Sequence, residues 1–290
     1  MKEDLKRKKY WIWFSRIKAI GSKRKQRLLT QFQTPEKIYT LTKSEWKNIK
    51  GIGEVGQNEL LSLSYREDLE QYLETMEKEG ISFLTIQDKE YPQQLKEIYD
   101  PPISLYVKGK LNAINTNGIA IVGCRKCSSY GEKAAYYFSY HLAKQGRAII
   151  SGLAEGIDAC SHLGCLSAKG QTIAVVGNGL DHVYPAKNQE LARQMIEQNG
   201  LILSEYPLGT KPERMNFPAR NRIISGISKG VLVIEAKEKS GTMLTVDFAL
   251  EQGRDVYAVP GNINSPYSVG TNRLIQEGGA KLVKNYLDIE

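Results

Sequence analysis

The chain has 290 residues, which is enough for one large α/β domain and a smaller one. Apolar residues make up 41% and charged residues 25%, as in ordinary soluble globular proteins. No apolar run approaches the roughly 20 residues that span a bilayer. The start, MKEDLKRKKYWIWF, has charges followed by only a short apolar stretch, which excludes a secretory signal. We therefore expect a cytoplasmic protein with no membrane segment.

The positive charge lies almost entirely at the start of the chain. Residues 1–64 hold 15 Lys and Arg against 6 Asp and Glu, a net charge of +9, and the remaining residues hold 25 against 26. A basic first segment on a near-neutral body favours a polyanionic partner. A solubilising surface is the alternative.

Residues 1–64 have a helical pattern with two similar interruptions, IKAIGSKRKQRLL at 17–29 and IKGIGEVGQNELL at 49–61. Both resemble the helix-hairpin-helix module, in which a glycine-rich hairpin exposes backbone N–H groups at a helix start, a favourable place for phosphate. The second copy, with Gly51-Ile52-Gly53, fits better, because the first lacks the second glycine. A compact helical bundle with glycines at helix ends explains both equally well.

The rest of the chain predicts a sheet. Residues 65–117 form a connecting segment, with a charged helix at 66–79 and short strands at 81–86 and 103–109, which we expect to pack on the following domain. Residues 118–290 alternate apolar strands with helices. The predicted strands are 118–122, 148–150, 172–176, 201–203, 231–236 and 256–259. Uniformly apolar strands separated by helices indicate a mainly parallel, doubly wound α/β sheet covered on both faces.

Small and cationic residues follow these strands. Because ligands of doubly wound folds bind outside the carboxyl ends of the strands, we expect these residues to form a phosphate site. The candidates are Gly123, Arg125 and Lys126 after the first strand, Ser151 and Gly152 after the second, Lys187 after the third, and Lys237, Ser240, Gly241 and Thr242 after the fifth. A plain turn is the alternative at any one strand end, but several in register favour a binding site.

The segment FPARNRIISG (217–226) adds the remaining candidates. It predicts a helix whose first turns carry Arg220, Asn221 and Arg222, where the helix dipole favours anions. Phe217, with Tyr130 and Tyr184, could stack on bases. The alternative is a charged helix start that covers buried isoleucines.

Chemical groups for catalysis are missing from these turns. The sequence has no Walker-type loop and no dinucleotide fingerprint. The three histidines fall on separate elements, and His162 is expected to be packed rather than a general base. Asp158 and Asp181 are expected to cap helices or fix loops rather than act as a catalytic pair. We expect the pair Cys124 and Cys127 to be reduced thiols rather than a metal site, so neither a metal nor a cofactor is predicted.

These motifs together resemble the DprA/Smf family of DNA-processing proteins. The resemblance covers residues 80–289 well and 1–64 more loosely. The strings that carry it are IVGCR (121–125), SGLAEGID (151–158), GNGLDHVYP (177–185), SEYPLG (204–209), FPARNRIISG (217–226), VLVIEAKEKSGT (231–242) and GRDVYAVPG (253–261). Cys124 departs from the usual serine. The chain stops soon after Val283, so the C-terminal winged helix of many members is expected to be absent.

The resemblance implies an extended Rossmann-like domain behind a small helical domain similar to the sterile-alpha-motif fold. It implies a non-enzymatic protein that binds and protects single-stranded DNA, loads the recombinase RecA during natural transformation, and forms a homodimer through the Rossmann-like domain. It places the DNA pocket at Arg125, Ser151-Gly152, Arg220-Asn221-Arg222, Lys237 and the Ser240-Gly241-Thr242 turn.

Two alternatives of another class remain. The Ser-Gly-Thr turn resembles the phosphate loop of nucleoside-monophosphate phosphoribohydrolases, but those enzymes need a glutamate after it, whereas this chain has Met243-Leu244-Thr245 and its nearest acid is Asp247. A small-nucleotide sensor of the same fold branch is the other alternative.

Overall fold

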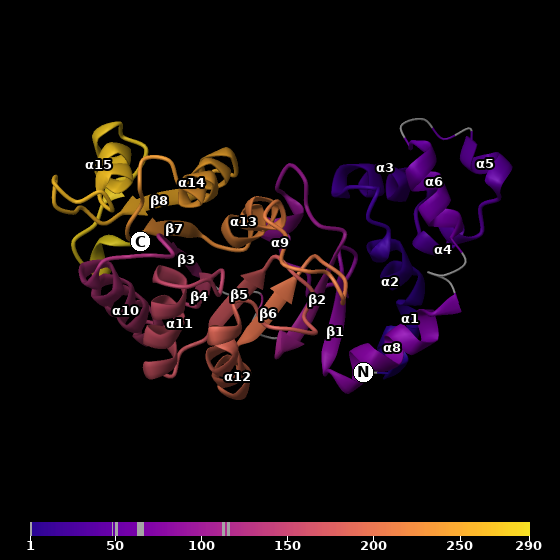
Figure 1. Ribbon diagram of the computed structural model, residues 1–290, viewed down its shortest axis with the longest axis horizontal. Coiled ribbons are helices and arrows are strands. Elements are labelled where there is room, and N and C mark those ends of the chain that lie inside the picture. Colours follow the sequence, from indigo (N-terminus) through magenta and orange to yellow (C-terminus); the bar gives the residue numbers. More distant parts are fainter. Residues whose placement is uncertain (1, 48, 50–51, 63–66, 112–113, 115–116) are drawn as a thin grey trace.

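A computed structural model describes residues 2–47, 49, 52–62, 67–111, 114 and 117–290. In this part of the chain nine strands form one sheet in the order β1-β2-β6-β5-β4-β3-β7-β8-β9 (Figure 1). The strands are β1 (Ile81–Thr85), β2 (Ser104–Gly109), β3 (Ile119–Val122), β4 (Ile149–Ser151), β5 (Thr172–Val176), β6 (Leu201–Ser204), β7 (Gly230–Val233), β8 (Asp255–Ala258) and β9 (Lys281–Leu282).

The strands from β3 to β9 pair in parallel, and helices cover both faces of the sheet. Helices α10 (Ser129–Lys144), α11 (Ile157–Ser167) and α12 (Gln189–Glu197) lie on one face, and α13 (Asn216–Gly226), α14 (Gly241–Glu251) and α15 (Val269–Gln276) on the other. Within β3 the side chains alternate: Ile119 and Ile121 pack in the core with α10 and α11, and Ala120 and Val122 in the core with α13 and α14. Apolar burial on both faces is why these strands lack polar alternation, and the predicted Rossmann-like fold is confirmed.

The order of the strands reverses between β3 and β7. From β3 the chain winds outward through β4, β5 and β6, then returns along α13 to place β7 on the opposite side of β3. The loops that follow β3 and β7 therefore separate at the carboxyl edge and leave a crevice. In open α/β sheets such a switch point is the usual ligand site.

Helices of the N-terminal segment lie at the β1 end of the sheet (Figure 1). They are α1 (Lys2–Arg7), α2 (Lys9–Arg16), α3 (Ser22–Phe32), α4 (Pro35–Tyr39), α5 (Lys43–Lys47) and α6 (Glu54–Leu61). Trp13, Phe14 and Trp46 are fully buried among them. The same apolar core continues to Phe83 of β1 and Tyr106 of β2, so burial of these rings ties the helices to the sheet.

The segment after these helices contributes two strands to the sheet itself. Helix α8 (Leu69–Lys78) leads into β1, which pairs antiparallel with β2, and β2 pairs antiparallel with β6. The short helix α9 (Gln93–Lys96) lies between the two strands. The expected division near residues 64 and 117 stays a prediction, because residues 63–66 and 115–116 lie outside the described part of the chain. The elements that were not predicted include the helices α9 and α15, the strand β9 and the 3₁₀ turns Ala186–Asn188 and Tyr286–Asp288.

The structure favours the helical-bundle explanation of the first glycine interruption. Gly21 precedes α3, but the carboxylate of Glu59 on α6 accepts hydrogen bonds from the amides of Lys18 (2.7 Å) and Ala19 (3.0 Å). An internal carboxylate thus occupies hairpin donors that a phosphate would use. Gly51 of the second copy lies outside the described residues, so the preference for that copy stays a prediction.

The remaining bulk expectations concern membranes and metals. No helix in the described ranges is long and apolar enough to cross a membrane. Among the same residues, no group of three His, Cys, Asp or Glu side chains is arranged to hold a metal ion. The four cysteines are free thiols, and burial, with nearby Cys160 and acidic side chains, raises the pKa of Cys127 to about 11. Such a thiol is protonated at neutral pH and is a weak nucleophile.

His162 makes stability depend on pH. It is fully buried in α11, with Nδ1 2.7 Å from Oγ1 of Thr172, and burial, assisted by the charge of Arg220, lowers its pKa from 6.5 to about 3. Between these values the unfolded chain binds a proton that the folded chain does not, so the free energy of unfolding should fall as pH drops from 6.5 towards 3. Urea unfolding across this range should show a smaller slope for His162→Asn. An unchanged slope in His162→Asn would contradict the assignment.

Candidate nucleic-acid interface

A cavity of about 950 Å³ lies at the switch point of the sheet. Most of its lining comes from three segments: the loop after β3 (122–126), the first turns of α13, and residues 237–245 after β7. Ten of the predicted site residues line this cavity: Gly123, Arg125, Lys126, Phe217, Arg220, Asn221, Lys237, Ser240, Gly241 and Thr242. The structure therefore brings together residues that are more than a hundred positions apart in sequence.

The charge of the cavity is strongly positive. Six cationic side chains line it against two acidic ones, Asp158 and Glu238. The cations are Arg125, Lys126, Arg214, Arg220, Lys237 and Lys239. Three of these cations are exposed: Arg125, Lys126 and Lys237. In the described part of the chain, none of the three has a carboxylate within ion-pair distance. An anionic ligand would supply the missing counter-charge.

Aromatic rings stand beside these cations. The Arg125 guanidinium lies 4.9 Å from the centre of the Phe217 ring, and the Phe217 and Tyr184 rings are 5.8 Å apart. Lys237 lies 5.1 Å from the ring of Tyr267. Cations interleaved with aromatic rings are typical of surfaces that hold single-stranded nucleic acid, because phosphates and bases are contacted together.

The turn predicted to face phosphate lies at the start of α14. Ser240 is the N-cap of this helix, Gly241 and Thr242 are its first residues, and the first amides of a helix have no partner within the helix. The Ser240 hydroxyl is buried without a hydrogen-bond partner among the described residues. Asn221 of α13 donates to the carbonyl of Gly241 (3.3 Å), which fixes the two helix starts side by side. Helix N-termini in this arrangement favour an anion.

Glu235 organises the loop that carries Arg125 and Lys126. It is 1% exposed, and its carboxylate accepts hydrogen bonds from the amide (2.9 Å) and hydroxyl of Ser128. Ser128 in turn caps α10 by accepting from the amide of Gly131 (3.1 Å). The sequence predicts Glu235 only as part of the strand 231–236, whereas β7 ends at Val233. One feature of the sequence could have indicated its role. A single carboxylate stands at the end of an apolar run, and a carboxylate buried there needs a hydrogen-bond partner.

Arg220 forms the floor of the cavity, and Gly152 packs against its guanidinium. The guanidinium is 4% exposed and donates to the carbonyl of Val175 (2.6 Å). Burial lowers the pKa of Arg220 to about 10, and Asp158 beside it partly compensates. A Cβ on Gly152 would lie 1.9 Å from Nη1 of Arg220 and 2.6 Å from the Asp158 carboxylate. Glycine is therefore needed here to make room for the buried Arg220 guanidinium and the Asp158 carboxylate, rather than to approach a phosphate as its position suggested.

Ser151 has a structural contact of its own. It is fully buried, and its hydroxyl donates to the carbonyl of Ile121 (2.7 Å) across neighbouring strands. Ser151 and Gly152 therefore lie beneath the cavity and do not line it.

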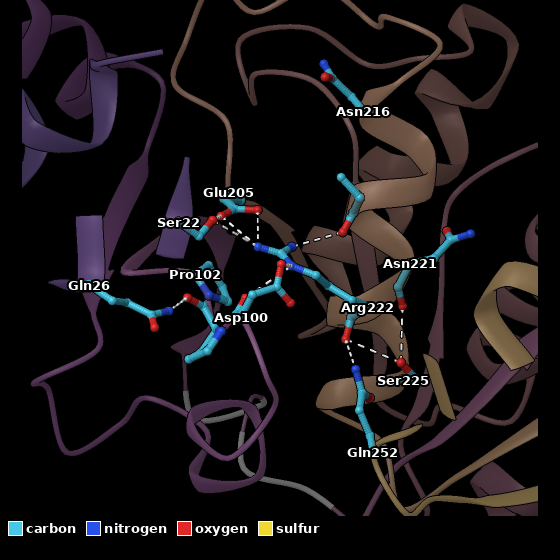
Figure 2. A network of polar contacts seen from close by, with 12 residues as sticks. Ser22, Gln26, Asp100, Pro102, Glu205, Asn216, Asn221, Arg222, Ser225 and Gln252 are labelled. Atoms are coloured by element: carbon cyan, nitrogen blue, oxygen red, sulfur yellow. Dashed lines mark hydrogen bonds and ion pairs between the residues drawn. The ribbon is translucent and has the colours of Figure 1, made fainter. Parts of the chain in front are cut away.

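Arg222 does not line the cavity. Figure 2 shows its side chain beside those of Asp100, Glu205 and Ser22. Residues two apart on a helix do not share a face, so Arg220 and Arg222 project differently from α13. Arg222 is buried and forms ion pairs with Asp100 (3.1 Å) and Glu205 (2.8 Å). Although burial lowers its pKa, these carboxylates outweigh that effect and raise it. Ser22 of α3 donates to Glu205 (2.7 Å), which joins the N-terminal helices to α13.

Lys187 also lies outside the cavity. It follows the cis peptide bond between Tyr184 and Pro185 and forms an ion pair with Glu155 at 2.7 Å. Both side chains are exposed, so this pair is weak and solvent can reach the lysine. Lys187 lines a separate cavity beside α12.

No glutamate directly follows the Ser240–Thr242 turn, where the hydrolase alternative requires one. Met243, Leu244 and Thr245 follow the turn on α14, and Asp247 does not line the cavity. Asp158, which does, is buried; burial raises its pKa while Arg220 lowers it. The amide of Ala154 also donates to it (3.3 Å). The hydrogen bond from Ala154 and the positive charge of Arg220 both stabilise the Asp158 carboxylate, so its place beside Arg220 is explained without a catalytic role.

The fold and the cavity define a Rossmann-like α/β protein with a cationic crevice at its switch point. Comparison with known families identifies it further: the family model described as DNA recombination-mediator protein A matches residues 82–290, and the chain belongs to this family. It is 41% identical over 243 residues to the DNA processing protein DprA of Bacillus subtilis, and this match covers 81% of this chain and 81% of the relative. It is 46% identical over 205 residues to DprA of Streptococcus pneumoniae, covering 71% of this chain and 72% of the relative.

Solved structures agree with this assignment. The crystal structure of S. pneumoniae DprA superposes with a TM-score of 0.81 at 36% identity and covers 97% of this chain and 96% of its own. DprA of Helicobacter pylori, whose single-stranded DNA binding mode has been described structurally, gives a TM-score of 0.65 at 32% identity and covers 72% and 94%. The first superposition includes the N-terminal helices, since it spans nearly the whole chain.

Replacing Gly152 tests the floor of the cavity. Gly152→Ala should displace the Arg220 guanidinium from Val175 and cost about 1–3 kcal/mol of unfolding free energy, as overpacking of a core does. Gly241→Ala is the control, because no described atom lies within 4 Å of its Cβ position. Chemical denaturation of both variants measures the difference. Equal stabilities would show that the pocket beneath the cavity can accept a methyl group.

Replacing Arg222 tests the connection between α13 and the N-terminal helices. Arg222→Met should leave Glu205 and Asp100 without their partner and cost about 3 kcal/mol. Arg193→Met removes exposed ion pairs with Glu190 and Glu197 and should cost less than about 1 kcal/mol. A thermal or urea unfolding series compares the two, and similar losses would argue against a structural role for Arg222.

Proposed function

We propose that this chain binds single-stranded DNA in the switch-point cavity, protects it, and loads the recombinase RecA onto it, without catalysing a reaction itself. The observation that carries the proposal is the meeting of exposed cations, aromatic rings and a helix N-terminus in one cavity. The family supports it, because the H. pylori relative has a described single-stranded DNA binding mode. Phosphate contacts supply most of the affinity and should make it strongly dependent on salt.

Each part of the cavity has a role in this proposal. Arg125, Lys126 and Lys237 neutralise phosphates, and the amides at Ser240–Thr242 hold one phosphate at the start of α14. Phe217 and Tyr184 offer rings to bases. Arg220 shapes the floor. Lys187 remains exposed to solvent despite its ion pair with Glu155, and it contacts the DNA strand where that strand leaves the cavity.

Loading of RecA and homodimerisation through the Rossmann-like domain also belong to this proposal. Both rest on membership of the family, and the cavity supports them only by providing the DNA to be handed over. A variant that loses DNA binding should lose RecA loading but keep the dimer, because the two interfaces would be separate. Light scattering and a RecA filament assay on the same preparation test this.

Substitution of the exposed cations tests the DNA site. Arg125→Ala and Lys237→Ala should each weaken binding of an oligo-dT about tenfold, since a hydrogen bond to a charged group contributes about 1.5–3 kcal/mol. Each should also reduce the slope of log affinity against log salt by about 0.7 if it removes one phosphate contact. Fluorescence anisotropy across a salt series measures both.

Arg193→Ala, on the exposed surface of α12, is the matched control and should keep the wild-type affinity and slope. If Arg125→Ala and Lys237→Ala behave like this control, the DNA site lies elsewhere. Release of a free base from nucleoside monophosphates by the wild type would instead support the phosphoribohydrolase alternative.

A further inference from the structure

Helix α10 carries a group of tyrosines that the switch-point cavity does not use. Tyr130 and Tyr137 are 50% and 39% exposed. With Lys133 they recur at a helical spacing of three and four residues, which places them on one face of α10. Large exposed aromatic side chains on one face usually mark an interaction site.

A second cavity, of about 340 Å³, lies beneath this face. Tyr130, Lys133 and Tyr137 line it on one side, and Pro260 and Lys284 on the other. The hydroxyl of Tyr130 donates to the carbonyl of Pro260 (2.8 Å), which fixes one ring across the opening. A cavity of this size is at the small end of those that hold a ligand.

The ionisable groups of this cavity other than the tyrosines are two lysines. Neither Lys133 nor Lys284 has a carboxylate within ion-pair distance in the described ranges, and no acidic side chain lines the cavity there. An anion is therefore the complementary ligand, and the rings require that it also carry a planar apolar group. Single-stranded nucleic acid combines the two.

The two cavities lie at the same edge of the sheet. Pro260 follows β8, which pairs with β7, and Lys284 follows β9, so the second cavity lies at the carboxyl ends of the last two strands of the sheet. Lys126 lines the first cavity, and only three residues separate it from Tyr130 at the start of α10. A chain that leaves the switch point past Lys126 reaches the tyrosine face without crossing the molecule.

We propose that the tyrosine face of α10 is a second contact for single-stranded DNA, continuous with the switch-point cavity. Bases stack on Tyr130 and Tyr137, and phosphates lie against Lys133 and Lys284. This inference rests on the proposed function, because it extends the path of the same strand. A double helix would not suit the site, since its bases are already stacked on one another.

A second copy of this chain fits the face less well. A twofold interface places the same patch on itself. It would bring the two lysines of each copy towards those of the other, with no acidic lining residue to offset the repulsion.

The length dependence of binding tests the proposal. The wild type should bind an oligo-dT of about twenty nucleotides more tightly than one of about six, because only the longer strand reaches both sites. The double variant Tyr130→Ala/Tyr137→Ala should lose about fivefold or more in affinity for the longer strand and keep its affinity for the shorter one. Tyr130→Phe/Tyr137→Phe should retain most of the gain, because phenylalanine keeps the stacking surface.

Tyr136→Ala is the matched control. Tyr136 lies on the same helix with a similar exposure of 43%, stacks on Tyr140, and does not line the cavity. A second measurement needs no variant. Long strands whose nucleotides beyond the first six or so lack bases should bind the wild type as weakly as the tyrosine-to-alanine variant binds ordinary DNA.

Four outcomes would overturn the proposal. Unchanged affinity of the alanine variant for the long strand, or full affinity of the wild type for the strand lacking bases, removes the stacking contact. If the alanine variant loses the same factor in affinity for the long and the short oligo-dT, the substitutions act on the first cavity. A change in oligomeric mass without a change in length dependence assigns the face to a second copy. If the wild type binds neither strand, the proposed function fails as well, whereas the first three outcomes leave it intact.

Discussion

Helix α13 is held from two directions by two arginines, and the switch-point cavity depends on that position. Arg220 extends under the cavity to Val175 of β5, and Arg222 extends to Glu205 and Asp100 beside the N-terminal helices. Both guanidinium groups are buried, and a buried charge is stable only with partners. The helix therefore has one well-defined position. Its first turns form a cavity wall that meets the start of α14 through Asn221.

The cations that lie nearest solvent have a different role from the buried pair. Arg125, Lys126 and Lys237 stay exposed in a concave site, where like charges raise the local potential and attract a polyanion. Glu235 holds the loop of Arg125 and Lys126 through Ser128, and among the described residues it forms no ion pair with either cation. The chain thus separates charges that build the site from charges that are available to a ligand. The lysines at the α10 cavity belong to the second group.

The sequence predicted the fold well because its strands are apolar throughout and its helices are bounded by glycines, so local patterns agree with burial. Ten of the fourteen predicted site residues line one cavity, and most of them do so because they follow strands at the same edge of the sheet. It failed where a side chain's direction decides the outcome. Arg222 and Arg220 are two positions apart, and only the packing of α13 shows that one faces the sheet and the other the N-terminal helices. Gly152 matched a phosphate turn, yet its lack of a side chain serves Arg220.

A structure of this chain with a short oligo-dT tests the central claim most directly. The account predicts one phosphate at the amides of Ser240–Thr242 and a neighbouring phosphate at Arg125, with a base against Phe217. A strand bound on another surface, with the switch-point cavity empty, would contradict it.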